Sequence, residues 1–289
     1  MITKSRRLRE LLAKPGLVMA PGSYDAFSAK VVEKAGFDAV YLSGGGSAGS
    51  LGYADFGLRT LTEKFIQLEG ICSSLNIPLI ADGEAGYGSA IHVLRMIREY
   101  EKAGASGMHM EDQDLPRRCG HMKGKKLVSQ KEFVNKIKAA VDARTDPDFL
   151  LISRIDAIAV EGFDRAIERA HAYIEAGIDV LFFEAIESEE QLRKIPKLIK
   201  KPLLVNLVEG GKTPIINAKE LEKMGYKIAI YPSTTLMAAV YAMEKALKEL
   251  KRTGTTDGIR AEMATFQYVY RDLAGWDKVM ELIDKYSAE

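Results

Sequence analysis

The sequence predicts an α/β protein, a closed (β/α)₈ barrel of parallel strands, on three observations. Eight strand-length apolar runs alternate with helix-length amphipathic segments, several of these segments end at glycine, and 289 residues suit one such barrel. We expect the strands at residues 17–20, 39–42, 78–81, 107–110, 149–153, 180–183, 202–205 and 228–230. An open doubly wound sheet is the alternative, but no dinucleotide-binding glycine fingerprint follows the first strand.

Helical patterns fill the intervals between these strands. Apolar side chains recur three and four positions apart, as an amphipathic helix requires, in residues 26–35, 62–75, 90–103, 163–176 and 218–224. A short amphipathic helix also precedes the first strand, where a secretory signal would have an apolar core. Glycine, a common helix stop, follows four of the helical patterns, at Gly36, Gly104, Gly177 and Gly225.

The pattern divides the chain near residue 232. Residues 1–232 should form the barrel with its N-terminal helix and a gating loop at about 113–128. Residues 233–289 should supply the closing helix of the barrel and a C-terminal helical extension for packing in a homo-oligomer. A helical cap on the same barrel is equally consistent with this part. Its helical patterns cover residues 236–252, 259–273 and 276–286.

Composition excludes several classes of function. A net charge of +1 gives no basis for binding nucleic acid or an anionic membrane surface, and the apolar runs are too short to span a bilayer. Two cysteines cannot make a disulfide framework, so we expect reduced thiols and a cytoplasmic protein. Cys72 lies in a helical pattern and should be buried, which leaves Cys119 as the thiol of chemical interest.

Nearly every expected strand is followed at once by a polar group. These groups include Ser43, Asp82, Glu84, Glu111, Arg154, Glu184 and Asn206. Barrel enzymes build their active sites at the carboxyl ends of the strands, so we expect these side chains to converge in one pocket.

The acidic members of this set indicate a metal site. Asp82, Glu84 and Glu111 offer hard oxygen ligands on neighbouring strand ends, which suits Mg²⁺ or Mn²⁺. No histidine pair occurs at zinc-binding spacing. Asp55 either joins the outer shell of the metal or caps its own loop.

The basic and glycine-rich members indicate an anionic substrate. Arg154 is placed to clamp a substrate carboxylate, although an internal ion pair with Glu184 competes with this role and both can hold. The turn at Ser43, Gly44 and Gly45 either presents backbone N–H groups to an anionic oxygen or is a plain tight turn.

A loop after the fourth strand carries a cysteine among cationic groups. Arg117 and Arg118 precede Cys119, and His121 follows it. Cationic neighbours favour the thiolate, so we expect a lowered thiol pKa and a reactive Cys119. An arginine-rich surface loop with an incidental cysteine is the alternative. Together with the metal ligands, the loop suits a metal-chelated 2-hydroxy or 2-oxo acid, with Cys119 giving a proton to an enolate. On the fourth strand, we expect His109 to be a satisfied core histidine.

Five motifs, with their spacing, resemble the isocitrate lyase/phosphoenolpyruvate mutase superfamily over essentially the whole chain. They are DGEAGYG at 82–88, EDQ at 111–113, RCGH at 118–121, RIDA at 154–157, and Asn206 followed by GKTP at 211–214. The nearest branches are the 2-methylisocitrate lyase, carboxyphosphonoenolpyruvate mutase-like and 2-alkylmalate lyase branches. The resemblance implies a TIM-type barrel, Mg²⁺, an enolate intermediate, and a homotetramer whose C-terminal helices are exchanged between subunits.

The resemblance also implies roles for individual residues. The implied metal ligands are Asp82 and Glu111, with Asp55 and Glu84 in the outer shell. The implied substrate-binding residues are Ser43, Gly44, Gly45, Arg154 and Asn206. The general acid would be Cys119, on a gating loop with Arg118 and His121, while Glu184 would orient that loop and Tyr41 would be a base for the 2-hydroxyl.

Three departures from the family pattern bear on the substrate. Glu84 replaces the usual second aspartate of the metal motif, and Arg117 replaces the lysine that commonly opens the loop motif. An arginine that similar 2-methylisocitrate lyases carry shortly after the Tyr-Pro turn is absent from residues 233–237. Without that cation, a third substrate carboxylate has no evident partner, which leaves simpler 2-alkylmalates open.

The leading hypothesis is therefore a Mg²⁺-dependent carbon–carbon lyase acting on a 2-hydroxy di- or tricarboxylate. Candidate substrates are 2-methylisocitrate, giving pyruvate and succinate, and 2-alkylmalates. The alternatives are a carboxyphosphonoenolpyruvate-type phosphonomutase, an oxaloacetate decarboxylase, and a barrel that binds a metabolite without turning it over.

Overall fold

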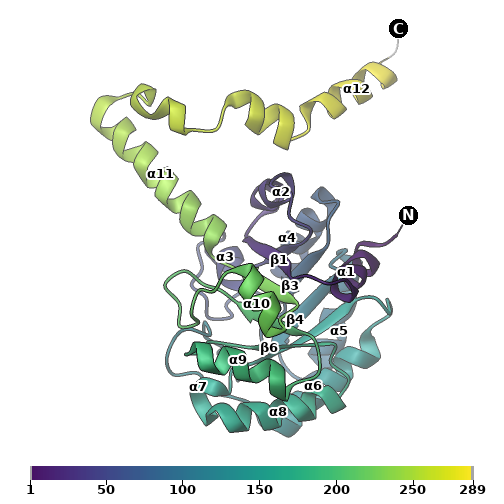
Figure 1. Ribbon diagram of the computed structural model, residues 1–289. Helices are drawn as coiled ribbons and strands as arrows, with labels where there is room; N and C mark the ends of the chain where they lie inside the picture. Colours follow the sequence, from purple (N-terminus) through teal and green to yellow (C-terminus); the bar gives the residue numbers. More distant parts are fainter. Residues whose placement is uncertain (1, 288–289) are drawn as a thin grey trace. The chain divides into compact units, whose positions relative to one another are not determined.

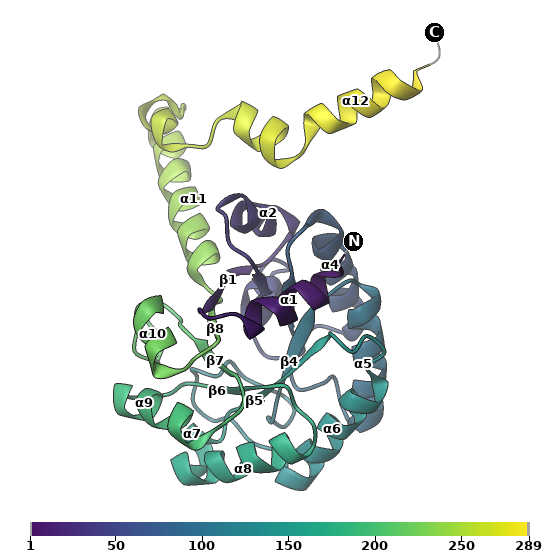
Figure 2. The ribbon, with the colours of Figure 1, turned by 45° about the vertical axis from the view of Figure 1, so that its right-hand side comes forward.

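The computed structural model describes residues 2–287, which divide into two compact units after Thr234. In the first unit, eight parallel strands follow one another in sequence order, and β1 pairs with β8 to close the barrel (Figures 1 and 2). The strands are β1 Val18–Ser23, β2 Val40–Leu42, β3 Leu79–Asp82, β4 Gly107–Glu111, β5 Leu150–Ile155, β6 Val180–Phe183, β7 Leu203–Asn206 and β8 Ile228–Tyr231. The predicted closed barrel is confirmed.

All eight strands occur where the sequence predicts them, but most extend further at the carboxyl end. Asp82, Glu111, Arg154 and Asn206, expected just beyond the strands, lie within them. Each continues the inward–outward alternation of its strand. The polar groups are therefore held by the barrel backbone rather than by loops.

Helices surround the barrel, and local sequence accounts for their ends. Asp25 and Thr60 begin α2 and α4 with capping boxes, and Gly225 ends α10 in the left-handed region at φ 107°. The longer helices are α1 Lys4–Ala13, α2 Ala26–Lys34, α4 Leu61–Ser74, α5 Ala90–Lys102, α6 Gln130–Ala143, α8 Phe163–Glu175, α9 Glu189–Leu198 and α10 Ala218–Met224. Two short helices, α3 Gly44–Gly49 and α7 Ile158–Glu161, lie in loops after β2 and β5.

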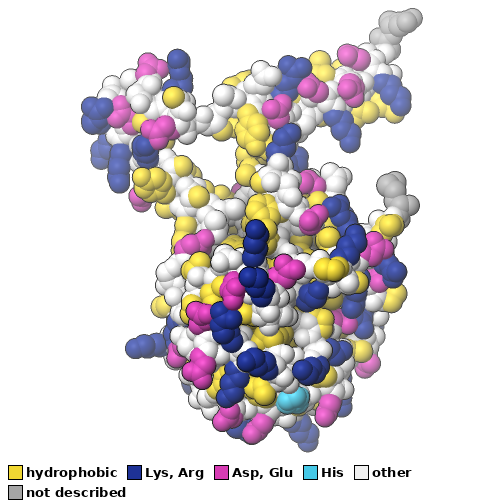
Figure 3. All heavy atoms as spheres, viewed as in Figure 1, with side chains coloured by type: hydrophobic (Ala, Val, Ile, Leu, Met, Phe, Trp, Pro, Cys, Tyr) yellow, Lys and Arg dark blue, Asp and Glu magenta, His cyan; other side chains and the backbone are white. Residues whose placement is uncertain are grey.

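The second unit contains helical segments only. They are α11 Thr234–Thr253, which begins at the last residue of the first unit, η1 Asp257–Glu262, η2 Gln267–Leu273 and α12 Trp276–Tyr286. The predicted continuous helix at 259–273 is wrong, because Met263 is extended and separates a 3₁₀ turn from a π-helical one. Hydrophobic side chains lie along this segment in Figure 3, and Leu247, Phe266 and Trp276 are exposed.

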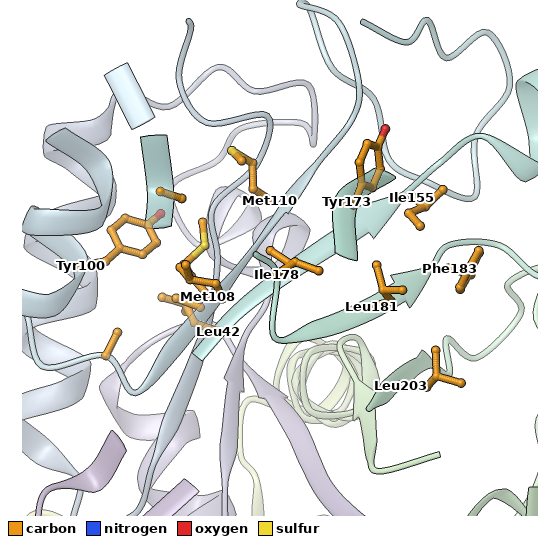
Figure 4. Close-up of a cluster of buried hydrophobic side chains, with 14 of the residues drawn as sticks. Leu42, Tyr100, Met108, Met110, Ile155, Tyr173, Ile178, Leu181, Phe183 and Leu203 are labelled. Atoms are coloured by element: carbon orange, nitrogen blue, oxygen red, sulfur yellow. The ribbon is translucent and has the colours of Figure 1, made fainter. Parts of the chain in front are cut away.

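The core has two layers. Inside the barrel, Tyr41, Ile80, Ile152 and Phe182 belong to one buried cluster. Outside it, strand residues pack against the helices in a larger cluster, of which Figure 4 shows Met108, Leu181 and Phe183 with other members. The alternation of side chains along each strand separates the two layers.

The N-terminal helix α1 packs against the inner layer. Leu8 is fully buried in the inner cluster, and Arg9 pairs with Asp179 at 2.9 Å between Nη2 and Oδ2. Asp179 precedes β6, so α1 covers the barrel at the amino ends of the strands. The carboxyl ends remain for the site. Within residues 2–287, no helix is both long enough and apolar enough to cross a membrane.

Candidate active site

Five strands carry a polar side chain at their last inward-facing position or, for Glu184 after β6, one residue beyond the strand. Inward apolar or aromatic residues precede these positions by two residues, as Ile80 precedes Asp82 and Phe182 precedes Glu184. The five residues are buried together at the carboxyl end of the barrel: Asp82, Glu111, Arg154, Glu184 and Asn206. The structure thus brings together the residues that sequence placed at the strand ends.

Arg154 is held on several sides by acids. Its Nη1 lies 3.2 Å from Glu111 Oε2, and its Nε lies 2.9 Å from Asp156 Oδ2 and 3.9 Å from Glu184 Oε2. The guanidinium stands over the ring of Phe182. Burial opposes its charge, but Asp156 and Glu184 hold the pKa of Arg154 well above its usual range. A fixed, permanently charged guanidinium of this kind suits a carboxylate ligand.

Glu111 and Asp55 share an arginine from the loop. Arg117 pairs with both carboxylates, so Glu111 lies between Arg117 and Arg154. Burial raises the pKa of Glu111 although both arginines favour its charged form. Asp55 therefore takes part in the polar cluster, whereas sequence left open a simple capping role for it.

Asp82 differs from the other acids of the cluster. Glu84 pairs with Arg59 at 2.6 Å, but among the described residues Asp82 has no arginine or lysine within 4.0 Å. Burial opposes ionisation of Asp82, but His109 and nearby cations hold its pKa well below its usual range. The result is a charged oxygen donor without a direct cationic partner.

This donor set fits a hard divalent cation. Across residues 2–287, no three His, Cys, Asp or Glu side chains are arranged as a complete set of metal ligands. An ion held by one or two carboxylates and otherwise by water, in the manner of Mg²⁺, is compatible with Asp82 beside Glu111.

The glycine-rich turn is the start of a helix. Ser43 caps α3, and its Oγ accepts a hydrogen bond from Gly46 N at 3.1 Å. A Cβ on Gly44 would overlap the Asp82 carboxylate, so only glycine lets the helix start approach that close. The Gly44 carbonyl accepts a bond from Arg59 at 3.1 Å, which fixes the turn from behind. The start of α3 therefore lies directly against Asp82.

Tyr41 and His109 lie beneath Asp82. The Tyr41 hydroxyl is 2.7 Å from His109 Nε2 and 3.4 Å from Asp82 Oδ2. Burial and the Asp82 charge raise the pKa of Tyr41 well above its usual range, so the phenol is neutral at physiological pH. The satisfied histidine that we expected is only half satisfied, since Nδ1 of His109 has no hydrogen-bond partner among the described residues.

The loop that carries Cys119 has a tight stem. Val128 N donates to Asp112 O at 3.1 Å, Asp114 N donates to Lys126 O at 2.8 Å, and a bridge joins Gln113 to Leu127. The side chain of Gln113 also binds the backbone of Arg118, five residues later: Gln113 Nε2 donates to the Arg118 carbonyl and Gln113 Oε1 accepts from the Arg118 N–H, each at 2.9 Å.

The expected thiolate of Cys119 is wrong. Burial raises the pKa of this thiol, outweighing a backbone hydrogen bond from His121. The two arginines do little to offset burial, because Arg117 is committed to carboxylates and Arg118 donates to Lys123 O at 3.2 Å. Cys119 is therefore a protonated thiol over the strand ends, the form that an acid requires.

The far side of the loop binds Glu184. His121 Nε2 lies 3.1 Å from Glu184 Oε1, and His121 Nδ1 accepts a hydrogen bond from Lys212 N at 3.1 Å. Asn206 Nδ2 donates to Glu184 Oε2 at 3.1 Å. Asn206 Oδ1 is buried without a partner among the described residues, so an acceptor is available to a ligand hydroxyl.

Sequence reasoning missed four charged residues of this network. Asp156 could have been predicted, because it lies two positions after Arg154 and side chains two positions apart along a strand point to the same side. Nothing in the local sequence distinguished the other three: Arg59, Lys64 and Lys125. All four are buried.

Barrel, acid cluster, fixed arginine and closed loop define an enzyme with its active site at the carboxyl ends of the strands. Residues 8–251 match the family model described as phosphoenolpyruvate phosphomutase. The chain is 45% identical over 282 residues to 2,3-dimethylmalate lyase of Eubacterium barkeri, covering 97% of each sequence. It is 44% identical over 269 residues to a 2-methylisocitrate lyase of Aeropyrum pernix, covering 93% of this chain and 86% of that one.

A crystal structure of 2,3-dimethylmalate lyase, a member of the PEP mutase/isocitrate lyase superfamily, has the same fold. Its TM-score is 0.93 at 40% identity, over 100% of this chain and 97% of that one. The chain therefore belongs to the PEP mutase/isocitrate lyase superfamily, as its motifs predicted. Like these relatives, it is a lyase.

Proposed function

We propose that the protein is a Mg²⁺-dependent lyase that cleaves the C2–C3 bond of a 2-hydroxy acid and releases pyruvate. A 2-alkylmalate such as 2,3-dimethylmalate, giving pyruvate and propionate, is the first candidate substrate. 2-Methylisocitrate, giving pyruvate and succinate, is the second. The observation that carries the proposal is the Cys119 thiol, whose pKa is raised by burial and whose loop lies against Arg154 and Glu184 at Gly120.

Asp82 and Glu111 would hold the ion, with Glu84 and Asp55 acting through water. When bound, Mg²⁺ acidifies a coordinated hydroxyl and stabilises developing negative charge on oxygen. Asp82 suits a direct ligand because it is charged and unpaired with arginine or lysine in the described chain. Arg117 forms ion pairs with Glu111 and Asp55, so the two carboxylates would have to leave Arg117 in order to bind the ion directly, or would act on it through water.

The remaining polar groups of the site would each bind a different part of the substrate. Arg154 offers a bidentate site for the carboxylate of the pyruvoyl half, and the first amides of α3, at Gly44 and Gly45, face the oxygens beside it. The unpartnered Asn206 Oδ1 would accept a hydrogen bond from a substrate hydroxyl. Tyr41, the predicted base, contacts Asp82 but is itself neutral, so it would need the field of a bound cation to lose its proton.

Cys119 completes the reaction. Transfer of the 2-hydroxyl proton to the base, for which deprotonated Tyr41 is the candidate, lets the C2–C3 electron pair move to C3, so that pyruvate forms together with a carbanion next to the second carboxylate. The thiol gives its proton to that carbon, and the resulting thiolate is reprotonated from solvent before the next turnover. A free thiol in this role suits a reducing compartment such as the cytoplasm.

We also propose that the protein is a homo-oligomer, a tetramer by family resemblance, in which another copy covers the second unit. None of the described residues of α11 or α12 is buried. Large apolar side chains, among them Leu247, Trp276 and Tyr286, are exposed. Size-exclusion chromatography with light scattering should give a mass of several chains, and a stable monomer would refute this.

The test of the activity is a substrate panel. The protein is incubated with Mg²⁺ and 2,3-dimethylmalate, citramalate, 2-methylisocitrate, isocitrate or oxaloacetate, and pyruvate or glyoxylate release is recorded. Pyruvate from one 2-hydroxy acid, abolished by chelator and strongly reduced in Cys119→Ser, supports the proposal. No release from any acid, with a new carbon–phosphorus bond by phosphorus NMR from a phosphoenolpyruvate derivative, would replace it by phosphonomutase chemistry.

A further inference from the structure

Lys125 is a buried lysine in the cysteine-bearing loop that the reaction above does not use. It is 8% exposed, whereas its neighbour Lys126 is exposed. Its Nζ donates to Gly120 O at 2.5 Å and to Asp156 Oδ1 at 2.8 Å. Lysine is rarely buried unless it is paired, so these two contacts explain its position. Gly120 directly follows Cys119, so one of them holds the peptide next to the thiol.

The partner of Lys125 belongs to the barrel. Asp156 follows β5, and its backbone N–H donates to Asp112 Oδ1 at 2.8 Å, which ties it to the end of β4. The Asp156 carboxylate also orients Arg154, because it accepts hydrogen bonds from Arg154 Nε at 2.9 Å and from Arg154 Nη2 at 3.2 Å. One carboxylate thus joins the loop tip to the arginine.

Opening of the loop would break this arrangement at a definite cost. Lys125 would leave Asp156 and the Gly120 carbonyl together, because both bonds depend on one ammonium group. Two charges that are paired in a buried setting would then be separated. The stem bonds between 112–114 and 126–128 do not depend on Nζ, so they can persist while the tip moves.

We propose that Lys125 is a positioning residue that clasps the loop tip to Asp156. Through this clasp it holds Cys119 over the strand ends at the carboxylate that orients Arg154. The inference rests on the proposed function in one respect, the role of Cys119 as the acid. The clasp itself is a property of the free protein and can be measured without a substrate.

The first measurement is the rate at which iodoacetamide alkylates each cysteine, followed by mass spectrometry. Lys125→Met keeps the length of the side chain but removes its charge and donors, and Lys126→Met is the matched control. We expect Cys119 to react at least about tenfold faster in Lys125→Met, a shift of about 1.4 kcal/mol in loop opening. The buried Cys72 should react at the wild-type rate in both variants. Loss of a cation alone raises a thiol pKa and slows alkylation, so acceleration reports loop opening.

The second measurement separates positioning from a general loss of structure. With the substrate identified by the panel, Lys125→Met should lower kcat by about 10²-fold, the cost of a misplaced group, with a smaller change in KM. Arg154 keeps its acidic partners and still binds the carboxylate. Lys125→Arg, which keeps a cation and its donors, should recover part of kcat and slow the alkylation again.

Two results would overturn the inference. One is a wild-type alkylation rate at Cys119 in Lys125→Met, and the other is equal acceleration at Cys72, which would mean global loosening. If Lys125→Met does not fold, Lys125→Gln carries the same test. If the acids give no product, the lyase proposal fails while the alkylation result still decides on the clasp.

Discussion

Replacement of Gly120 by alanine tests whether the loop must close over the arginine during turnover. A Cβ on Gly120 would lie against Arg154 Nη2 and against Cγ and Oε1 of Glu184, closer than real Cβ atoms approach. Neither neighbour can swing aside cheaply, because Arg154 is held by Asp156 and Glu184 is held by Asn206. The φ of Gly120 is not in the left-handed region, so alanine itself is tolerated by the backbone.

The size of the effect follows from the overlap. Carbon and its neighbours prefer separations of about 3.5–4.0 Å, so the loop tip must retreat by on the order of 1 Å. A displacement of this size at a reacting group costs about 10²-fold in rate, or ~2.7 kcal/mol of barrier. We therefore expect kcat of Gly120→Ala to fall about 10²-fold. The free energy of unfolding should change little, because the tip is not part of the hydrophobic core.

Pyruvate release coupled to lactate dehydrogenase measures kcat, and urea unfolding measures stability. The control is Gly70→Ala on the exposed side of α4, where a Cβ meets no atom within 4 Å. That variant should keep its rate. Turnover of Gly120→Ala at the wild-type rate would refute the reasoning, since it would mean that the closed contact with Arg154 and Glu184 is not used.

Three further predictions concern the surroundings of the cluster. Burial, together with Arg59, lowers the pKa of Lys64 to about 7, and the unfolded chain binds its proton up to about pH 10.4. The unfolded chain therefore binds more protons than the folded chain between these values, and the free energy of unfolding should rise with pH across this range. Urea titrations at several pH values should show a smaller rise in Lys64→Met. The exposed Lys131→Met is the control and should leave the rise unchanged. Asp82→Asn should abolish Mn²⁺ binding in isothermal titration calorimetry, and unchanged affinity would exclude Asp82 as the principal ligand. Ser43→Ala removes a helix cap and should cost about 1 kcal/mol; Ser129→Ala, which uncaps α6, should cost about the same, but only the former should lower activity.

The fold was predictable because it depends on short-range regularities. Apolar runs of strand length, helical patterns of period 3.6 and the glycines that end the helices can each be recognised within a short stretch of sequence. The alternation of side chains along a strand places Asp82, Glu111 and Arg154 inside the barrel, since each follows an inward residue by two positions. What failed was the helix at 259–273, where Met263 is extended despite a helical pattern on both sides.

The pairing of charges was not predictable in the same way. Arg59 reaches Glu84 across 25 residues, and Lys125 reaches Asp156 across 31. Neither pair is marked by local spacing, because the two partners meet only when separate loops fold onto the barrel. Sequence therefore identified which acids gather at the strand ends, but not which cation neutralises each of them. That distinction decides that Asp82, rather than Glu84, is the acid that no arginine or lysine of residues 2–287 neutralises directly.

The sign of the Cys119 shift shows why partners matter more than proximity in the sequence. Arg117 and Arg118 directly precede Cys119 in the sequence, yet Arg117 is paired with Glu111 and Asp55. Burial is therefore the main influence on the pKa of the Cys119 thiol. Burial disfavours the thiolate, so the pKa is high while the loop is closed. Opening would remove that penalty and admit water, which in the proposed reaction would return the proton that Cys119 gives to the substrate. In the proposed reaction, closure of the loop would therefore supply position and protonation state together, because the movement that would present Cys119 to the carbanion would also keep it protonated.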